Sequence, residues 1–131
     1  MIQETKIKGL HQLKLDIMKQ YSLYSLLRKD CGGGGLVIGV LKDLPSTWIA
    51  EGDDQIECIV IEVWIEGFPV RVLNGYGPQE SDDSDRKRGY WDFVEREVQK
   101  AKIADAGIII QMDSNCHFGP DLIKNDVNPQ N

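Results

Sequence analysis

The sequence is poor in the features of secreted and membrane proteins. Its three cysteines, Cys31, Cys58 and Cys116, lie far apart and form no C-x-x-C pair, which argues against a disulfide framework or a zinc knuckle. No apolar run approaches the roughly 20 residues of a membrane-spanning helix. The opening MIQETK lacks the basic and apolar regions of a signal peptide. These absences predict an intracellular protein, nuclear or cytoplasmic, that does not contact a membrane.

Positive charge is also scarce. The 131 residues contain 15 Lys and Arg against 21 Asp and Glu, which gives a net charge of −6. A protein that binds nucleic acid by neutralising phosphates normally has a basic face. We therefore expect any contact with a polyanion to be weak, and to depend on a local patch or on bound cations.

Nucleotide-binding fingerprints are absent as well. The glycine run at residues 32–35 fits neither G-x-x-x-x-G-K-[ST] nor G-x-G-x-x-G. Two interpretations stay open for this run. It is either a flexible turn before a strand or a backbone that must lie close to a substrate, where a Cβ atom would intrude.

Hydropathy periodicity predicts one domain, residues 1–131, in which helices and strands alternate. A helix is expected at 9–20, and a second one runs from an N-cap at Ser84 or Asp85 to about residue 103. Strands are expected at residues 1–3, 21–27, 36–41, 56–65, 69–77 and 107–112. Antiparallel hairpins with helices on an outer layer predict an α/β or α+β sandwich.

Burial and connections follow from the same pattern. The strand at 107–112 is expected to be buried, because it is mostly apolar. Residues 45–55 have loop composition, and 118–131 are interpreted as an irregular C-terminal tail. The buried face of the second helix is predicted to carry Trp91, Val94, Val98 and Ala101.

Polar side chains stand at the ends of three of these strands. Glu4 follows the first strand, Asn74 and Tyr76 end the fifth, and Asp113 and Asn115 follow the last. Loops beyond strand ends are accessible and rest on a rigid scaffold, so they often carry ligand groups. The sequence therefore predicts that these side chains meet at one edge of a sheet.

The chemistry of these groups suits a metal and a phosphate. Glu4 and Asp113 supply the hard oxygen ligands that Mg²⁺ prefers. Asn115 is neutral, so it can orient a phosphate oxygen or an attacking water without adding repulsion, and the hydroxyl of Tyr76 can donate to a phosphate oxygen. A D-x-N segment is also a common Asx-turn, so each residue alone is weak support.

Five pieces of sequence, taken in order, resemble the endonuclease/exonuclease/phosphatase superfamily, in the branch of apurinic-type endonucleases found in non-LTR (LINE-type) retrotransposons. The pieces are IQETK at 2–6, RKDCGGGGLVIGV at 28–40, VLNGYGPQ at 72–79, YWDFVEREV at 90–98 and IIIQMDSNCHFG at 108–119. Their order and spacing fit that family across nearly the whole chain. The resemblance implies a four-layer α/β sandwich with mixed, mostly antiparallel sheets and outer helices, and DNA as the substrate.

Residue roles follow from the resemblance, position by position. Glu4 resembles the metal-binding glutamate, and Mg²⁺ or Mn²⁺ is the implied cofactor. Tyr76 resembles the active-site tyrosine, Asp113 the aspartate that orients or deprotonates the attacking water, and Asn115 the asparagine that holds the phosphate. Asn74 belongs to the same motif and is a candidate substrate-binding residue.

The sequence also departs from the family pattern. Met112-Asp113-Ser114-Asn115 stands where many relatives have Gly-Asp-Phe-Asn. The resemblance places the first strand of the family before Met1, and the S-D-H segment with its general-base histidine after Asn131. Neither His11 nor His117 occupies that histidine's position, although His117 is a candidate for substrate contact at the rim of the site.

Three functions remain open from the sequence. The first is a Mg²⁺-dependent DNA endonuclease that is weakly active or inactive as this chain alone. The second is a non-catalytic, truncated nuclease-like domain that retains some metal or nucleic-acid binding. The third is a phosphatase of the same superfamily. Unpaired sheet edges also predict self-association.

Overall fold

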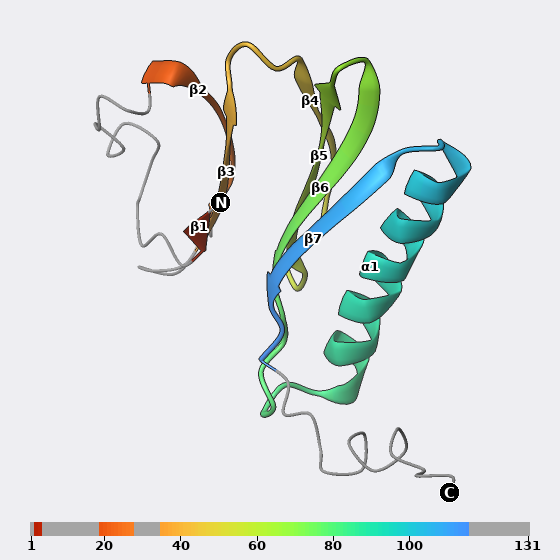
Figure 1. The fold of residues 1–131 in the computed structure, drawn as a ribbon. Coiled ribbons are helices and arrows are strands. Elements are labelled where there is room, and N and C mark those ends of the chain that lie inside the picture. The colour runs from red at the N-terminus through yellow and green to blue at the C-terminus, as the bar shows by residue number, and fades with distance from the viewer. Residues whose placement is uncertain (1, 4–18, 28–34, 116–131) are drawn as a thin grey trace, which may run out of the picture.

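A computed structural model describes residues 2–3, 19–27 and 35–115, and these residues form seven strands and one helix (Figure 1). The elements are β1 (Ile2–Gln3), β2 (Tyr21–Leu26), β3 (Leu36–Leu41), β4 (Ser46–Glu51), β5 (Glu57–Ile65), β6 (Phe68–Tyr76), α1 (Ser84–Ile103) and β7 (Gly107–Asp113). The expected strands are all present within a residue or two at their ends. The tail at 118–131, and residues 9–18 of the first expected helix, lie outside the described residues.

The strands form two sheets. Sheet A has the order β1-β3-β2 and sheet B the order β4-β5-β6-β7. Every pairing is antiparallel except that of β6 with β7, which is parallel. The hairpin of β5 and β6 closes at Glu66 and Gly67, whose φ angles of 51° and 82° are those of a tight two-residue turn. The predicted hairpin is therefore confirmed.

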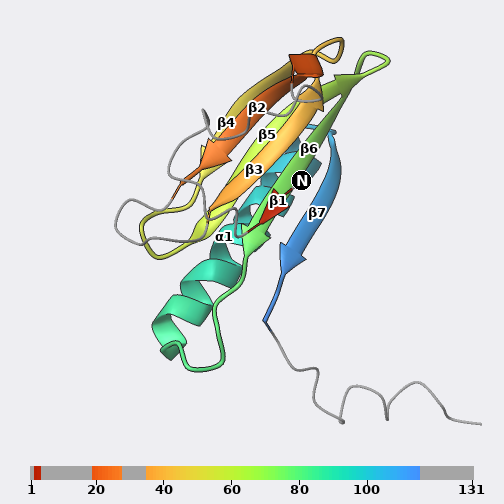
Figure 2. The same ribbon diagram turned by 90° about the vertical axis from the view of Figure 1, so that its left-hand side faces the viewer.

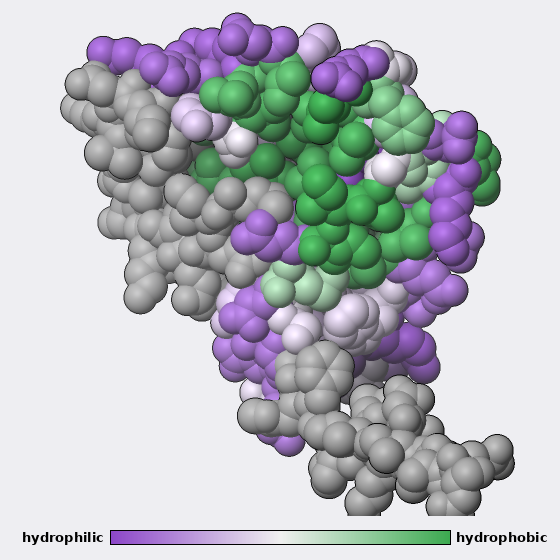
Figure 3. All heavy atoms as spheres, in the orientation of Figure 1, coloured by the Kyte–Doolittle hydropathy of each residue, from purple (hydrophilic) through white to green (hydrophobic). Residues whose placement is uncertain are grey.

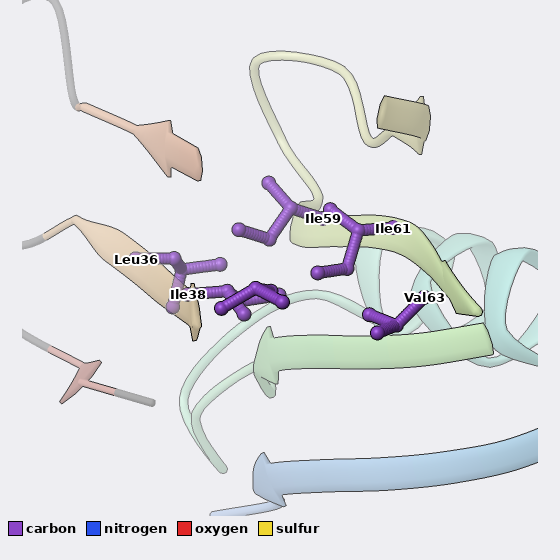
Figure 4. Close-up of a cluster of buried hydrophobic side chains, with 6 residues drawn as sticks. Leu36, Ile38, Ile59, Ile61 and Val63 are labelled. Carbon is purple, nitrogen blue, oxygen red and sulfur yellow. The ribbon is translucent and has the colours of Figure 1, made fainter. Parts of the chain in front are cut away.

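Sheet A covers one face of sheet B, and α1 covers the other (Figures 1 and 2). Between the sheets lies an inter-sheet core from alternate residues of two strands, Leu36, Ile38 and Val40 of β3 with Ile59, Ile61 and Val63 of β5 (Figure 4). Each such side chain contributes about 1.5–3 kcal/mol when fully buried. At one margin the hydroxyls of Tyr24 and Ser46 share a hydrogen bond of 2.8 Å between the sheets.

The opposite face of sheet B packs against α1. The helix-side core comprises Cys58, Val60, Leu73, Tyr90, Phe93 and Val94. Because β5 is buried on both faces, it has an almost continuous apolar sequence and little alternation. Gly75 is required here, since a Cβ atom at that position would meet the Cys58 sulfur at 2.8 Å.

The helix differs in two details from the expectation. Its N-cap is Asp83, whose side chain accepts from the backbone N–H of Arg86 at 2.8 Å, and not Ser84 or Asp85. Trp91 is 40% exposed, whereas its neighbour Tyr90 is 1% exposed. The other three predicted residues are on the packed face, since Val94 and Ala101 are buried and Val98 is partly buried against the α1 side of the core. The pattern did not indicate Glu97, a charged residue that is also buried on this face.

Residues 45–55 were expected to be a loop, and this expectation is wrong for β4. The strand has an alternating pattern of exposed and half-buried residues and pairs with β5 at the edge of sheet B. Its register shifts between Trp48 and Ala50. Pro45 and the polar residues on both sides resemble loop composition, but an edge strand with one solvated face tolerates them.

The expected burial of β7 is also wrong. Ile109 is 50% exposed and Ile110 is 42% exposed. Ile109 pairs with Val72 in parallel register, so it shares the face of sheet B that looks toward sheet A. Among the described residues β7 is the edge strand of sheet B opposite to β4, and Figure 3 shows apolar surface on this side of the molecule.

The predicted α/β architecture with mostly antiparallel sheets is confirmed. In the part of the chain that the structure describes, no helix is long and apolar enough to cross a membrane.

Candidate functional site at the ends of β6 and β7

The candidate site lies where two neighbouring strands end together. β6 and β7 run in parallel, and their arrowheads point to the same edge of sheet B (Figure 2). Tyr76 and Asp113 are register partners at this edge. Side chains of register partners project from the same face of a sheet, which here is the face toward sheet A. A phenol and a carboxylate from distant parts of the sequence are thereby brought side by side.

The two groups have different surroundings. Tyr76 is half-buried and packs against the inter-sheet core. Asp113 is exposed. Its Oδ1 atom accepts a hydrogen bond from the backbone N–H of Asn115 at 3.1 Å, which is the Asx-turn that the D-x-N segment suggested. Its Oδ2 atom accepts no hydrogen bond from any described residue.

Asn115 reaches across to β6. Its Nδ2 atom donates to the carbonyl oxygen of Gly77 at 2.8 Å. The N–H of Gly77 in turn donates to the carbonyl oxygen of Asp113 at 2.7 Å. Asn115 has a φ of 48°, a left-handed conformation that asparagine tolerates better than most residues. The structure therefore brings Tyr76, Asp113 and Asn115 together.

Asn74 occupies a different position. It is fully buried, and its Nδ2 atom lies 3.5 Å from the carbonyl oxygen of Val37 in β3. The side chain thus links β6 to sheet A, two residues before the strand ends. Its role in substrate binding stays a prediction.

The direction of β1 bears on the predicted position of Glu4. Ile2 and Val37 are antiparallel partners, and β3 runs opposite to β6 (Figure 2). β1 therefore runs toward the edge at which β6 and β7 end, and Glu4 is the next residue but one after Ile2. Glu4 and His117 lie outside the described residues, so their placement stays a prediction.

A metal ion would need ligands from more than the described residues. Within these residues no group of three or more His, Cys, Asp or Glu side chains is placed to hold a metal. Mg²⁺ commonly binds through one or two carboxylates and keeps several waters. The exposed Asp113 carboxylate, with one oxygen not engaged by the described residues, fits one such ligand. Glu4 is the candidate for the other.

Gly77 shapes the candidate site, although the sequence pattern did not single it out. A Cβ atom at Gly77 would lie 2.7 Å from the carbonyl oxygen of Ser114 and 2.9 Å from that of Asp113. Backbone atoms cannot move aside as a flexible side chain can, so glycine is required where β6 meets the end of β7. The Gly77-Pro78 dipeptide in the NGYGPQ segment was the available signal.

The single described cysteine is unsuited to nucleophilic chemistry. Burial between α1 and sheet B raises the pKa of the Cys58 thiol from 9.0 to about 12, against a lowering by its hydrogen bond with Tyr90, and the charge of Glu97 raises it further. Thiolate is the nucleophilic form of cysteine. Cys58 is therefore an inert core residue at physiological pH.

The layered arrangement of two facing sheets and an outer helix is the endonuclease/exonuclease/phosphatase fold, of which this chain forms a part. Solved structures of TDP2 share it. TDP2 from C. elegans superposes with a TM-score of 0.64 at 20% identity, over 88% of this chain and 37% of that chain. A truncated C. elegans TDP2 gives a TM-score of 0.64 at 19% identity, over 88% of this chain and 48% of that one.

A humanized D. rerio TDP2 with 14 mutations gives a TM-score of 0.58 at 18% identity, over 88% of this chain and 51% of that one. The chain thus spans about half or less of the length of these solved chains. At this level of identity the likeness concerns the fold. No family model matches the sequence, and no curated protein matches it either.

Proposed function

We propose that this chain is the metal- and phosphate-binding part of an enzyme that hydrolyses phosphodiesters with a divalent cation. The observation that carries the proposal is the pairing of Tyr76 with Asp113 at the shared end of β6 and β7. TDP2, with the same fold, belongs to a superfamily of metal-dependent phosphodiesterases, which supports the reaction class.

The proposed roles divide between metal and phosphate. Glu4 and Asp113 hold Mg²⁺ or Mn²⁺, and Asp113 also orients the attacking water. Tyr76 donates to a phosphate oxygen, and Asn115 holds the phosphate. Asn74 and His117 are proposed to contact substrate. When bound, the cation supplies Lewis-acid stabilisation of the charge that develops on the phosphoryl oxygens.

The proposed substrate is DNA, bound weakly and with help from the cation. A net charge of −6 gives the chain no general attraction for a polyanion. Of the three basic residues that open α1, two pair with acidic neighbours, Arg86 with Asp82 at 2.9 Å and Arg88 with Asp85 at 2.7 Å. Contact with a phosphodiester therefore depends on the cation. An intracellular location, nuclear or cytoplasmic, is part of the proposal.

The narrower proposal is a nicking endonuclease of the LINE-type retrotransposon branch. It rests on the sequence pieces that resemble that branch, above all IQETK, NGYGPQ and the D-x-N segment. Weak activity is expected of the 131 residues alone, because neither of the two histidines, His11 and His117, takes the position of the family's general base. General-base catalysis is worth about 10²–10⁴-fold in rate.

The test compares a phosphodiester with a phosphomonoester. The 131-residue chain is incubated with supercoiled plasmid, bis(p-nitrophenyl) phosphate or p-nitrophenyl phosphate, with Mg²⁺, Mn²⁺ or EDTA. Slow, metal-dependent cleavage of the two diesters that is lost in Asp113→Asn supports the nuclease. Hydrolysis of the monoester alone indicates the phosphatase, and metal binding without cleavage of any substrate indicates the non-catalytic domain.

Self-association is a second proposed property. β7 is the edge of sheet B within the described residues, and Ile109 and Ile110 are half-exposed on it. An edge strand with apolar side chains offers unpaired backbone groups to another strand. We therefore expect this chain to form dimers or larger species through β7.

A further inference from the structure

The end of the β6–β7 ladder shows an exchange of hydrogen-bond donors. In a regular parallel strand pair, the backbone N–H of Gly77 donates to the carbonyl oxygen of Asp113. The next hydrogen bond then runs from the backbone N–H of residue 115 back to the carbonyl oxygen of Gly77. The first of these bonds is present at 2.7 Å. The second is made by the Nδ2 atom of Asn115, at 2.8 Å, in place of its backbone N–H.

The displaced backbone N–H has a new partner. The backbone N–H of Asn115 donates instead to Oδ1 of Asp113 at 3.1 Å. The left-handed φ of 48° sets the direction of the Asn115 side chain relative to this N–H. One residue therefore makes two bonds with different effects. Its side chain continues the ladder, and its backbone holds the carboxylate of Asp113.

We propose that Asn115 and Gly77 are positioning residues for the site, and that together they fix the Asp113 carboxylate beside Tyr76. This proposal rests on the proposed function, because it assigns a purpose to the orientation of Asp113. Gly77 contributes by the absence of a Cβ atom, which would lie 2.7 Å from the carbonyl oxygen of Ser114. Asn115 contributes by its amide group and by its tolerance of the left-handed conformation.

In this proposal Asn115 positions Asp113 and can still contact a phosphate group of the substrate. An amide nitrogen carries two hydrogens, and the bond to Gly77 uses one of them. The second hydrogen stays available to a phosphate oxygen. The bond to Gly77 then also fixes the direction in which that second hydrogen points.

Three substitutions at Asn115 separate its contributions. Asn115→Gly keeps the left-handed conformation but removes the amide group. Asn115→Asp keeps the size and replaces the donor by an acceptor, which repels the carbonyl of Gly77. Asn115→Ala loses the amide and strains the backbone as well. If the amide matters, the glycine and aspartate variants are both impaired. If only the backbone conformation matters, Asn115→Gly behaves like the wild type.

Two NMR measurements on the full 131-residue chain read out the effect. The first is hydrogen exchange of the Gly77 N–H, which we expect to be about fivefold faster in Asn115→Gly, as expected for the loss of one net hydrogen bond. The second is titration with Mn²⁺, followed by broadening of the Asp113 and Tyr76 signals. The Mn²⁺ concentration for half-broadening should rise by a similar factor, about fivefold.

Gly77→Ala should reproduce both changes, and Gly39→Ala is its control. A Cβ atom at Gly39 meets its nearest neighbour, Leu23 Cδ2, at an ordinary 3.5 Å. If Gly77→Ala does not fold, as judged by circular dichroism, the Asn115 variants still decide the question.

Two results would overturn the proposal in different ways. In the first, Mn²⁺ broadens the wild-type signals, and the Mn²⁺ concentration for half-broadening is the same in Asn115→Gly. This result would overturn the positioning role and leave the proposed function standing. Absence of Mn²⁺ broadening in the wild type would overturn the proposed metal site and the positioning role with it. In that case the exchange rate of the Gly77 N–H still reports whether the Asn115 amide holds the ladder.

Discussion

Tyr76 and Asp113 are opposite one another in a parallel strand pair, so backbone hydrogen bonds and not side-chain packing set their separation. Neighbouring strands lie about 4.8 Å apart. Replacing the carboxylate of Asp113 therefore leaves Tyr76 in place. For this reason isosteric substitutions at the shared end of β6 and β7 test the catalytic and binding roles of these side chains more than the stability of the fold.

Divalent metal should stabilise the folded chain. Mg²⁺ or Mn²⁺ that binds Glu4 and Asp113 only in the folded state raises the free energy of unfolding by about 2.7 kcal/mol at a hundred times its dissociation constant. Glu4→Gln or Asp113→Asn should abolish most of this gain. The measurement is thermal unfolding with and without millimolar metal, and Glu66→Gln in the distant hairpin turn is the matched control. An equal gain in all four proteins would show that the metal binds elsewhere.

The burial of Cys58 makes stability depend on alkaline pH. Its pKa is about 12 in the folded protein and 9.0 in a solvated chain. Below pH 9 the thiol is neutral in both states, and its contribution is fully present. As the pH rises from 9 toward 12, the unfolded chain loses the proton first, so stability falls.

Urea unfolding at pH 8 to 11 measures this effect. The free energy of unfolding should fall more steeply with pH in the wild type than in Cys58→Ala, which lacks the titrating group. At pH 8 the alanine variant is the less stable of the two, because it leaves a small cavity. If the free energy of unfolding falls equally with pH in the two proteins, Cys58 is not the group responsible.

Glu97 is a carboxylate buried on the inner face of α1, and we expect its replacement by an apolar residue to stabilise the fold. Its side chain is 1% exposed, its Oε1 atom accepts from Lys100 at 2.8 Å, and its Oε2 atom has no hydrogen-bond partner among the described residues. Glu97→Met should raise the free energy of unfolding by about 1 kcal/mol or more, because a buried charge is replaced by an apolar group of similar size.

Lys100→Met provides the opposite change at the same place. It removes the main partner and leaves the buried carboxylate, so it should lower stability by about 1–2 kcal/mol. Both values come from urea unfolding at neutral pH. Destabilisation by Glu97→Met would show that the carboxylate has a partner that supports the fold.

The β7 edge should control self-association. Ile109→Lys places a charge on the apolar edge and should shift the chain toward monomer in sedimentation velocity over a range of concentrations. Ile103→Lys, at the end of α1 and 86% exposed in the wild type, is the control and should leave the association unchanged. Equal behaviour of the two variants would place the association surface elsewhere.

The sequence predicted most of the fold where one physical signal dominated. The strands β5 and β6 have β-branched runs around a two-residue turn, and both were placed within a residue. β4 was missed because its polar outer face has the composition of a loop. The N-cap was placed one or two residues late because SDDSD offers several capping side chains, and only the bond to Arg86 selects Asp83.

The candidate site was predictable in its residues but not in its bonds. Tyr76 and Asp113 could be identified from their places after strands and from the family resemblance. The bond between Asn115 and Gly77 could not, because it depends on the register of two strands far apart in the sequence. The exposure of β7 depends likewise on how far sheet A extends, which no local pattern encodes.

The hairpin of β5 and β6 also sets an order of events during folding. Its first register partners, Ile65 and Phe68, are separated only by Glu66 and Gly67, so it closes with little loss of chain entropy. β6 and β7 can pair only after the long crossover through α1 has closed, which is slower. The β5–β6 hairpin is then expected to form before β7 pairs with β6. We therefore expect Tyr76 to be in place early and Asp113 to complete the site in a late step of folding.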